Sequence, residues 1–171
     1  LKQYPNYFYS VFLKHWISKS INYNLSKNEL NQIDSIIING GDGVHEHPTQ
    51  GLLDMMSIKE RFGRIKGLKI AIVGDILHSR VARSNIYGLL KMGAKVMVCG
   101  PSNLIPGKIE ELGAKVSDDI NFTLEWADAI NILRIQRERM GIGIVPSTRE
   151  YRNLFGINQQ RLEKFNKQIT V

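Results

Sequence analysis

The stretch Lys69-Ile70-Ala71-Ile72-Val73-Gly74-Asp75 decides the fold of this chain. Four consecutive apolar residues, three of them β-branched, lead into a Gly-Asp pair. A short apolar run without alternation is typical of a strand that is buried on both faces of a parallel sheet. The sequence therefore predicts a central parallel strand at this point.

On either side of this strand, apolar runs alternate with segments of helical pattern. Ser79 can cap a helix that runs to Lys91. Strands that alternate with helices at such spacing form right-handed β-α-β units, so the fold class is α/β with a doubly wound parallel sheet. Four strands are few for this class, and we expect an incomplete sheet with some apolar surface exposed. The other predicted strands are residues 95–100, 115–117 and 130–135, and the other helices are 48–62, 106–112, 122–128, 147–155 and a start at 158.

A polar, glycine-rich loop precedes the first of these helices and follows the apolar run of residues 36–38. Pro48 suits the first helical turn, where its missing N–H would have no partner. His47 then lies at the mouth of the helix, where free N–H groups and the positive end of the helix dipole attract anions. Gly51 lowers helix stability and is expected where close packing or a ligand needs the space. The loop reads Gly40-Gly41-Asp42-Gly43-Val44-His45-Glu46-His47-Pro48-Thr49-Gln50.

Three loops are expected to face one crevice, because ligands of open parallel sheets bind beyond the carboxyl ends of the strands. These loops are residues 75–83, 100–105 and 134–139. Arg80 and Arg134 are the candidate ligands for carboxylates, since a guanidinium can hold a carboxylate through two parallel hydrogen bonds. An exposed surface charge is the alternative for either arginine taken alone.

Several other kinds of site are not favoured. No Gly-x-Gly-x-x-Gly follows the central strand, and no Gly-x-Ser-x-Gly nucleophile elbow occurs. The neighbouring residues His45, Glu46 and His47 lack the His-Glu-x-x-His spacing of a zinc helix. The sequence therefore predicts neither a metal nor another cofactor.

The composition limits the classes of binding partner that this chain is expected to have. The chain has 171 residues, 43% of them hydrophobic, and a formal net charge of +7. Its basic residues never form a run of four, so the charge suits small anionic substrates better than nucleic acid. Cys99 is the single cysteine and lies in an apolar run, which predicts a buried, inert thiol and a cytoplasmic protein. No stretch approaches the roughly 18 apolar residues of a membrane span, so no membrane partner is expected.

The combined motifs resemble one enzyme family. Residues 41–54, ending Gly51-Leu52-Leu53-Asp54, are similar to the carbamoyl-phosphate segment of the aspartate and ornithine carbamoyltransferases. After the Gly-Asp strand, members of the ornithine branch carry a segment that resembles Asn-Asn-Val-Ala-Asn-Ser. This chain has Arg80 in that segment, and an arginine suits a dicarboxylic acid. The resemblance is therefore to the aspartate branch. It continues to about residue 164 through 67–75, Ser79-Arg80-Val81-Ala82-Arg83-Ser84 and Leu133-Arg134-Ile135-Gln136-Arg137-Glu138-Arg139.

The resemblance implies a reaction and a set of residue roles. Members of the aspartate branch are homotrimers that transfer the carbamoyl group of carbamoyl phosphate to L-aspartate for pyrimidine synthesis, without a cofactor. By this resemblance, His47 is catalytic and donates a hydrogen bond to the carbamoyl oxygen, and Gln50 holds the carbamoyl amide. Arg80 binds the α-carboxylate of aspartate. Arg134, assisted by Gln136, binds the β-carboxylate.

The two ends of the chain depart from the family pattern. Residues 1–35 contain no Arg and so lack the family's Ser-x-Arg-Thr phosphate loop; Phe8, Phe12 and Trp16 predict a packing helix there. The family's His-Pro segment near the carboxyl terminus is also missing. A chain truncated at both ends is expected to have little or no activity alone, and a non-catalytic amino-acid-binding or interaction module is the alternative.

The expected domain organisation follows from these departures. Residues 1–35 form a helical segment without family resemblance. Residues 36–66 are the end of a carbamoyl-phosphate-binding domain with the interdomain helix. Residues 67–171 are a partial aspartate-binding α/β domain.

Overall fold

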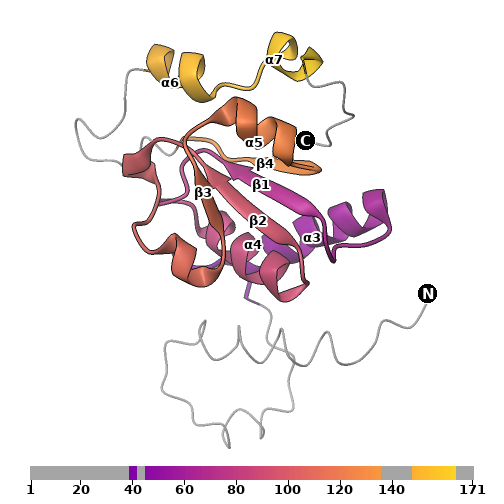
Figure 1. Ribbon diagram of the computed structural model, residues 1–171. Coiled ribbons are helices and arrows are strands. Elements are labelled where there is room, and N and C mark those ends of the chain that lie inside the picture. Colours follow the sequence, from indigo (N-terminus) through magenta and orange to yellow (C-terminus); the bar gives the residue numbers. More distant parts are fainter. Residues whose placement is uncertain (1–38, 42–44, 136–147, 165–171) are drawn as a thin grey trace, which may run out of the picture.

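The computed structural model describes residues 39–41, 45–135 and 148–164, and its centre is a sheet of four parallel strands (Figure 1). The strand order is β3-β2-β1-β4, so the chain crosses back over β1 to reach β4. This change of direction defines a doubly wound sheet and confirms the predicted α/β class. The strands are β1 (Lys69–Val73), β2 (Lys95–Cys99), β3 (Lys115–Ser117) and β4 (Ala129–Ile132).

β1 is the central strand, as the sequence predicts. It pairs with β2 on one side and with β4 on the other. Residues 70–73 are at most 1% exposed. Ile70 and Ile72 belong to one apolar core and Ala71 and Val73 to a second, because successive side chains of a strand point to opposite faces of the sheet.

Helices cover both faces of the sheet (Figure 1). α3 (Pro48–Phe62) and α4 (Arg80–Lys91) pack over the face that carries Ile70 and Ile72. The opposite face is covered by α5 (Ile120–Trp126), α6 (Thr148–Phe155) and α7 (Gln159–Glu163). Among the helices of the described residues, none is long and apolar enough to cross a membrane.

Local signals set the ends of α3 and α4 as predicted. Ser79 caps α4, and its Oγ accepts the N–H of Ala82 at 3.1 Å. α3 begins at Pro48 and ends before Gly63, whose φ of 71° lies in the left-handed region that glycine adopts easily. These boundaries place His47 directly before α3 and Arg80 at the start of α4.

Both ends of the helix predicted at 122–128, both ends of the strand predicted at 130–135 and one end of the strand predicted at 95–100 are misplaced, since α5 ends at Trp126 and β4 begins at Ala129. α5 begins at Ile120, two residues early, because the Asp119 carboxylate caps it by accepting two backbone N–H groups. β2 and β4 end at Cys99 and Ile132, before residues 100 and 135. The last residues of both strands pair with Val73, which is the last residue of β1. Beyond Val73, β1 therefore has no residue with which either strand could pair.

Residues 106–112 do not form the predicted helix. They hold one short 3-10 turn, η2 (Ile109–Leu112), and a second 3-10 turn, η1 (Ser102–Leu104), precedes them. Turns of three or four residues gain little stability from their own hydrogen bonds. Burial of Leu104 stabilises η1, and burial of Ile109 stabilises η2. The helix expected around Phe8 and Phe12 and the apolar run 36–38 lie outside the described residues.

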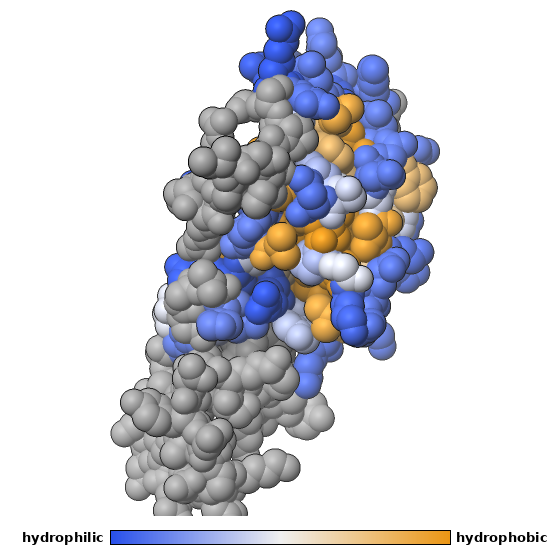
Figure 2. Space-filling view, turned by 90° about the vertical axis from the view of Figure 1, so that its left-hand side faces the viewer, coloured by the Kyte–Doolittle hydropathy of each residue, from blue (hydrophilic) through white to orange (hydrophobic). Residues whose placement is uncertain are grey.

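Part of the apolar surface is exposed, as expected for an incomplete sheet. Figure 2 shows apolar side chains gathered in the middle of one face, with hydrophilic ones around them. Ile132 on the edge strand β4 is 46% exposed, and Leu53 and Met56 on α3 are each 49% exposed. Within the described part, the sheet edge and the outer face of α3 therefore present apolar groups to solvent.

Candidate active site

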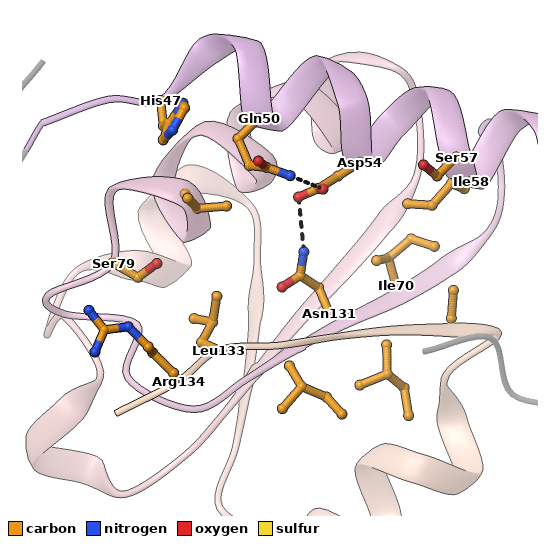
Figure 3. Close-up of a pocket in the computed structure, with 14 residues that line it drawn as sticks. His47, Gln50, Asp54, Ser57, Ile58, Ile70, Ser79, Asn131, Leu133 and Arg134 are labelled. Carbon is orange, nitrogen blue, oxygen red and sulfur yellow. Dashed lines mark hydrogen bonds between the residues drawn. The ribbon is translucent and has the colours of Figure 1, made fainter. Parts of the chain in front are cut away.

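A pocket of about 630 Å³ lies between helix α3 and strand β4 (Figure 3). Its polar end, near the carboxyl end of β4, holds His47, Gln50 and Arg134. The other end is apolar, with Ile58 and Ile70. The pocket thus brings the predicted helix-mouth residues together with one predicted arginine. Its remaining lining residues are Asp54, Ser57, Ser79, Val81, Ala129, Ile130, Asn131, Ile132 and Leu133.

The position of His47 is set by its backbone. Its N–H donates to Oγ of Ser84 at 3.0 Å, and its C=O accepts the N–H of Gly51 at 3.1 Å. Its half-buried ring lies with Nδ1 3.3 Å from Oγ1 of Thr49. The imidazole does not cap α3. Nε2 of the ring can therefore serve a ligand in the pocket.

Ser84 connects the glycine-rich loop to α4. Its hydroxyl donates to Oε2 of Glu46 at 2.6 Å. The hydroxyl oxygen of Ser84 also accepts the N–H of His47. Glu46 is 4% exposed and Ser84 is fully buried. A hydrogen bond to a carboxylate is shorter and stronger than one between neutral groups. This side chain therefore holds the start of α3 against α4.

Gln50 is held by Asp54, one turn later on α3. Nε2 of Gln50 donates to Oδ1 of Asp54 at 2.8 Å. The second carboxylate oxygen accepts Nδ2 of Asn85 on α4 at 2.6 Å and Nδ2 of Asn131 on β4 at 3.1 Å. Figure 3 shows the bonds from Gln50 and Asn131. One carboxylate thus joins α3, α4 and β4.

Arg134 follows β4, where a glycine lets two chain segments approach closely. Gly74 has a φ of 129°, and a Cβ at this position would lie 2.7 Å from the carbonyl oxygen of Leu133. The N–H of Leu133 donates to the C=O of Val73 at 2.8 Å. This contact fixes the backbone beside Arg134, whose exposed side chain lies at the polar end of the pocket (Figure 3).

Arg80 is not among the residues that line this pocket. Its guanidinium lies against Gly41, where a Cβ would be 3.2 Å from Nη1. Gly41 has a φ of 125°, which only glycine adopts easily. Arg80 therefore lies beside the glycine-rich loop that leads to His47. Gln136 lies outside the described residues.

The expectation that residues 100–105 face the same crevice is not met in this pocket, because none of them lines it. The loop packs instead on the turn after β1. The N–H of Leu77 donates to the C=O of Leu104 at 2.8 Å, and a Cβ at Gly100 would lie 2.5 Å from the carbonyl oxygen of Gly74. The loop therefore supports the turn between β1 and α4.

That turn contains a buried carboxylate. Asp75 is fully buried, and its Oδ1 lies 2.9 Å from Nδ1 of His78 and accepts the His78 N–H at 3.1 Å. On α6, burial raises the pKa of Tyr151 to about 12, with smaller contributions from Cys99 and Asp75. Burial also raises the pKa of the Cys99 thiol. The prediction that the Cys99 thiol is buried is confirmed.

The sequence reasoning missed three residues that build the polar end of the pocket. Asp54 follows Gln50 by four residues and so shares its helix face, which was a usable signal. Asn131 is a polar residue within an otherwise apolar strand. Ser84 gave no local signal, because its partners lie on a distant loop. In the part of the chain that the structure describes, no three His, Cys, Asp or Glu side chains are placed to hold a metal ion.

Solved structures share this fold. The catalytic subunit of M. jannaschii aspartate transcarbamoylase is 32% identical, with a TM-score of 0.62, over 84% of this chain and 49% of that chain. Aspartate transcarbamoylase from Trypanosoma cruzi in complex with carbamoyl phosphate is 24% identical, with a TM-score of 0.66, over 85% of this chain and 49% of that chain. At 24% identity, the second comparison supports the fold only.

The sheet and its pocket define an α/β domain with a pocket beside the carboxyl end of β4, lined at its polar end by His47, Gln50 and Arg134. No family model matches the chain. It is, however, 52% identical over 162 residues to the aspartate carbamoyltransferase catalytic subunit of Cytophaga hutchinsonii, which is 95% of this chain and 49% of that protein. It is 60% identical over 131 residues to the same subunit of Moorella thermoacetica, which is 77% of this chain and 43% of that protein.

The chain therefore belongs to the aspartate carbamoyltransferase family. It spans about half the length of the curated relatives it matches. The match with the C. hutchinsonii protein covers all but nine residues of this chain, so it extends into residues 1–35.

Proposed function

We propose that this chain carries part of the active site of an aspartate carbamoyltransferase. The reaction transfers the carbamoyl group of carbamoyl phosphate to the amine of L-aspartate and gives N-carbamoyl-L-aspartate and phosphate, a step of pyrimidine synthesis. The observation that carries the proposal is the pocket in which His47 and Gln50, at the start of α3, meet Arg134, at the end of β4. The family relationship supports it.

His47 is the proposed catalytic residue. If the Thr49 hydroxyl donates to Nδ1, the ring proton lies on Nε2 and can be donated to a ligand. The aspartate amine attacks the carbamoyl carbon, and the carbonyl oxygen takes up negative charge that the Nε2–H stabilises. The bond from that carbon to the phosphate oxygen then breaks, and phosphate leaves with the electron pair. The leaving phosphate takes up the one proton that the new amide nitrogen releases.

The two substrates need different partners in the site. Gln50 would hold the carbamoyl amide, and Arg134, assisted by Gln136, would hold the β-carboxylate of aspartate. Arg80, beside the glycine-rich loop, would bind the α-carboxylate. Attack of a bound amine on an activated carbamoyl carbon depends mainly on positioning two reactants and stabilising one oxyanion. No cofactor is needed for that chemistry.

The domain and assembly predictions belong to the same proposal. Residues 36–66 would complete a carbamoyl-phosphate-binding domain and its interdomain helix, and residues 67–171 would form part of an aspartate-binding domain. We propose a homotrimer in the cytoplasm, as the family resemblance implies.

Calorimetric titration of the 171-residue chain with N-(phosphonacetyl)-L-aspartate tests the proposal, because this ligand joins a phosphonate and an aspartate. We expect saturable binding that Arg134→Ala weakens at least about tenfold, since a charge-assisted contact is lost. Arg64→Ala removes the same charge from the exposed connector after α3 and should leave binding unchanged. Absence of binding by the unmodified chain, or equal loss in both variants, would contradict the proposal.

Binding and turnover are separate measurements. We expect little or no turnover of carbamoyl phosphate and aspartate by this chain alone. A non-catalytic amino-acid-binding module would bind aspartate and N-(phosphonacetyl)-L-aspartate with similar affinity. The proposed two-substrate site would bind the second ligand more tightly and lose part of that advantage in His47→Ala.

A further inference from the structure

Asp54 receives three amide N–H groups from three different elements. Gln50 on α3 donates to Oδ1 at 2.8 Å, and Asn85 on α4 and Asn131 on β4 donate to Oδ2 at 2.6 and 3.1 Å. Asp54, Gln50 and Asn131 also line the pocket. This carboxylate therefore sits between the proposed amide ligand and the two elements that position it.

The chemistry of a carboxylate decides which way the Gln50 amide points. An ionised carboxylate accepts hydrogen bonds and has none to donate. The NH2 group of Gln50 must therefore face Asp54, and its oxygen Oε1 must face away from Asp54 (Figure 3). A glutamine can present either a donor or an acceptor to a ligand, and here Asp54 selects the acceptor.

Asn85 indicates how strongly Asp54 controls its neighbours. Asn85 is 1% exposed, and its Oδ1 has no hydrogen-bond partner among the described residues. A buried polar atom without a partner is costly. The amide nevertheless keeps its nitrogen on Asp54 and leaves its oxygen against Gly51, where a Cβ would lie 3.3 Å away. The donor to Asp54 thus outweighs the unsatisfied acceptor.

We propose that Asp54 is a positioning residue that makes Gln50 a hydrogen-bond acceptor in the pocket and so selects a first substrate that carries an N–H donor. This inference rests on the proposed function. The carbamoyl group has an NH2 that can donate to Oε1 of Gln50. The acetyl group of acetyl phosphate has a methyl group at the same place, which would leave Oε1 without a partner.

Two substitutions separate orientation from simple support of the fold. In Asp54→Asn, Asn85 and Asn131 still donate, so the new amide keeps its oxygen toward them and turns its NH2 to Gln50. Gln50 must then reverse and present NH2 to the pocket. The double substitution Asp54→Asn/Gln50→Glu restores an oxygen that faces the pocket. Glu60→Gln removes one charge from the exposed side of α3 and serves as the control.

The measurement is competition by carbamoyl phosphate and by acetyl phosphate against bound N-(phosphonacetyl)-L-aspartate, in calorimetry of the full chain. The ratio of the two dissociation constants within one variant cancels general effects of charge and stability. We expect the unmodified chain and Glu60→Gln to prefer carbamoyl phosphate about fivefold or more. Asp54→Asn should abolish this preference, and the double variant should restore it.

The outcomes distinguish this inference from the proposed function. If N-(phosphonacetyl)-L-aspartate binds but the preference is absent in the unmodified chain, or persists in Asp54→Asn, the inference is wrong and the proposed function stands. Failure of the double variant to recover the preference also overturns it, because Asp54 would then act only through the fold. A chain that does not bind N-(phosphonacetyl)-L-aspartate contradicts the proposed function, and the inference with it.

Discussion

The backbone N–H of His47 donates a hydrogen bond of 3.0 Å to Oγ of Ser84, 37 residues later in the chain. The same hydroxyl donates to the buried carboxylate of Glu46 at 2.6 Å. One side chain of α4 therefore fixes the two residues that lead into α3. The imidazole that we propose as catalytic is placed by an element other than its own.

Ser84→Ala should lower the free energy of unfolding by about 1–3 kcal/mol, because a buried carboxylate and a backbone N–H both lose a partner. It should also weaken the binding of N-(phosphonacetyl)-L-aspartate, since His47 is no longer held. Urea denaturation and calorimetry measure the two effects. Ser57→Ala removes a hydroxyl that bonds the C=O of Leu53 at an exposed site and should cost little stability. Equal costs in the two variants would contradict the role of Ser84.

Gly51→Val should destabilise the protein by about 2–3 kcal/mol through overpacking. A Cβ at Gly51 would already lie 3.3 Å from both Oδ1 of Asn85 and Cβ of Ser84, and valine adds two methyl groups. The close packing that the sequence left as one explanation for Gly51 is present between α3 and α4. Met56→Val, at an exposed position of the same helix, measures the cost of valine in a helix alone. Similar melting temperatures for both variants would argue against a tight contact.

Gly74→Ala should cost about 2 kcal/mol or more, because its φ of 129° and the carbonyl oxygen of Leu133 both exclude a Cβ. Relief of this clash would move the end of β4 and with it Arg134, so binding of N-(phosphonacetyl)-L-aspartate should weaken as well. Gly107→Ala is the control, since a Cβ there would meet no atom within 4 Å. If Gly74→Ala is as stable as Gly107→Ala, the close approach does not constrain the strand end.

Tyr151 predicts a dependence of stability on alkaline pH. Burial raises its pKa from 10.0 to about 12, so the unfolded chain loses this proton before the folded protein does. The stabilisation is complete below pH 10 and is lost as the pH rises toward about 12. Tyr151→Phe keeps a ring beside Phe155, 5.7 Å away between centroids, and removes the ionisation. The urea midpoint of the unmodified protein should fall more steeply over this range than that of the variant; parallel curves would exclude the effect.

The helices and strands that the sequence predicts best are those with strong local signals. β1 needed only its apolar run, and α3 and α4 needed Pro48, Gly63 and Ser79 at their ends. The helix predicted at 106–112 was wrong. Its apolar pattern spans only a few residues, so burial and turn geometry decided the local conformation instead. The ends of β2 and β4 were misplaced because a strand ends where its partner ends.

The candidate site was predictable in part. His47, Gln50 and Arg134 were chosen from motifs, and the structure brings them to one pocket. Arg80 lies beside the glycine-rich loop and not on the pocket lining, a placement that no spacing rule could give. Its role, like those of the other predicted site residues, remains a proposal for the binding experiments above.

The sequence by itself determined the order of most elements, the α/β class and the family, because apolar periodicity, helix caps and motifs are properties of neighbouring residues. Only the tertiary structure decided that Asp54 shares its carboxylate with Asn131, 77 residues away, and that Ser84 holds His47. Hydrogen bonds between elements depend on how closely helices and strands pack. The spacing between these elements is set here by glycines at close contacts, such as Gly51 against α4 and Gly74 against Leu133. No pattern of neighbouring residues reveals this spacing.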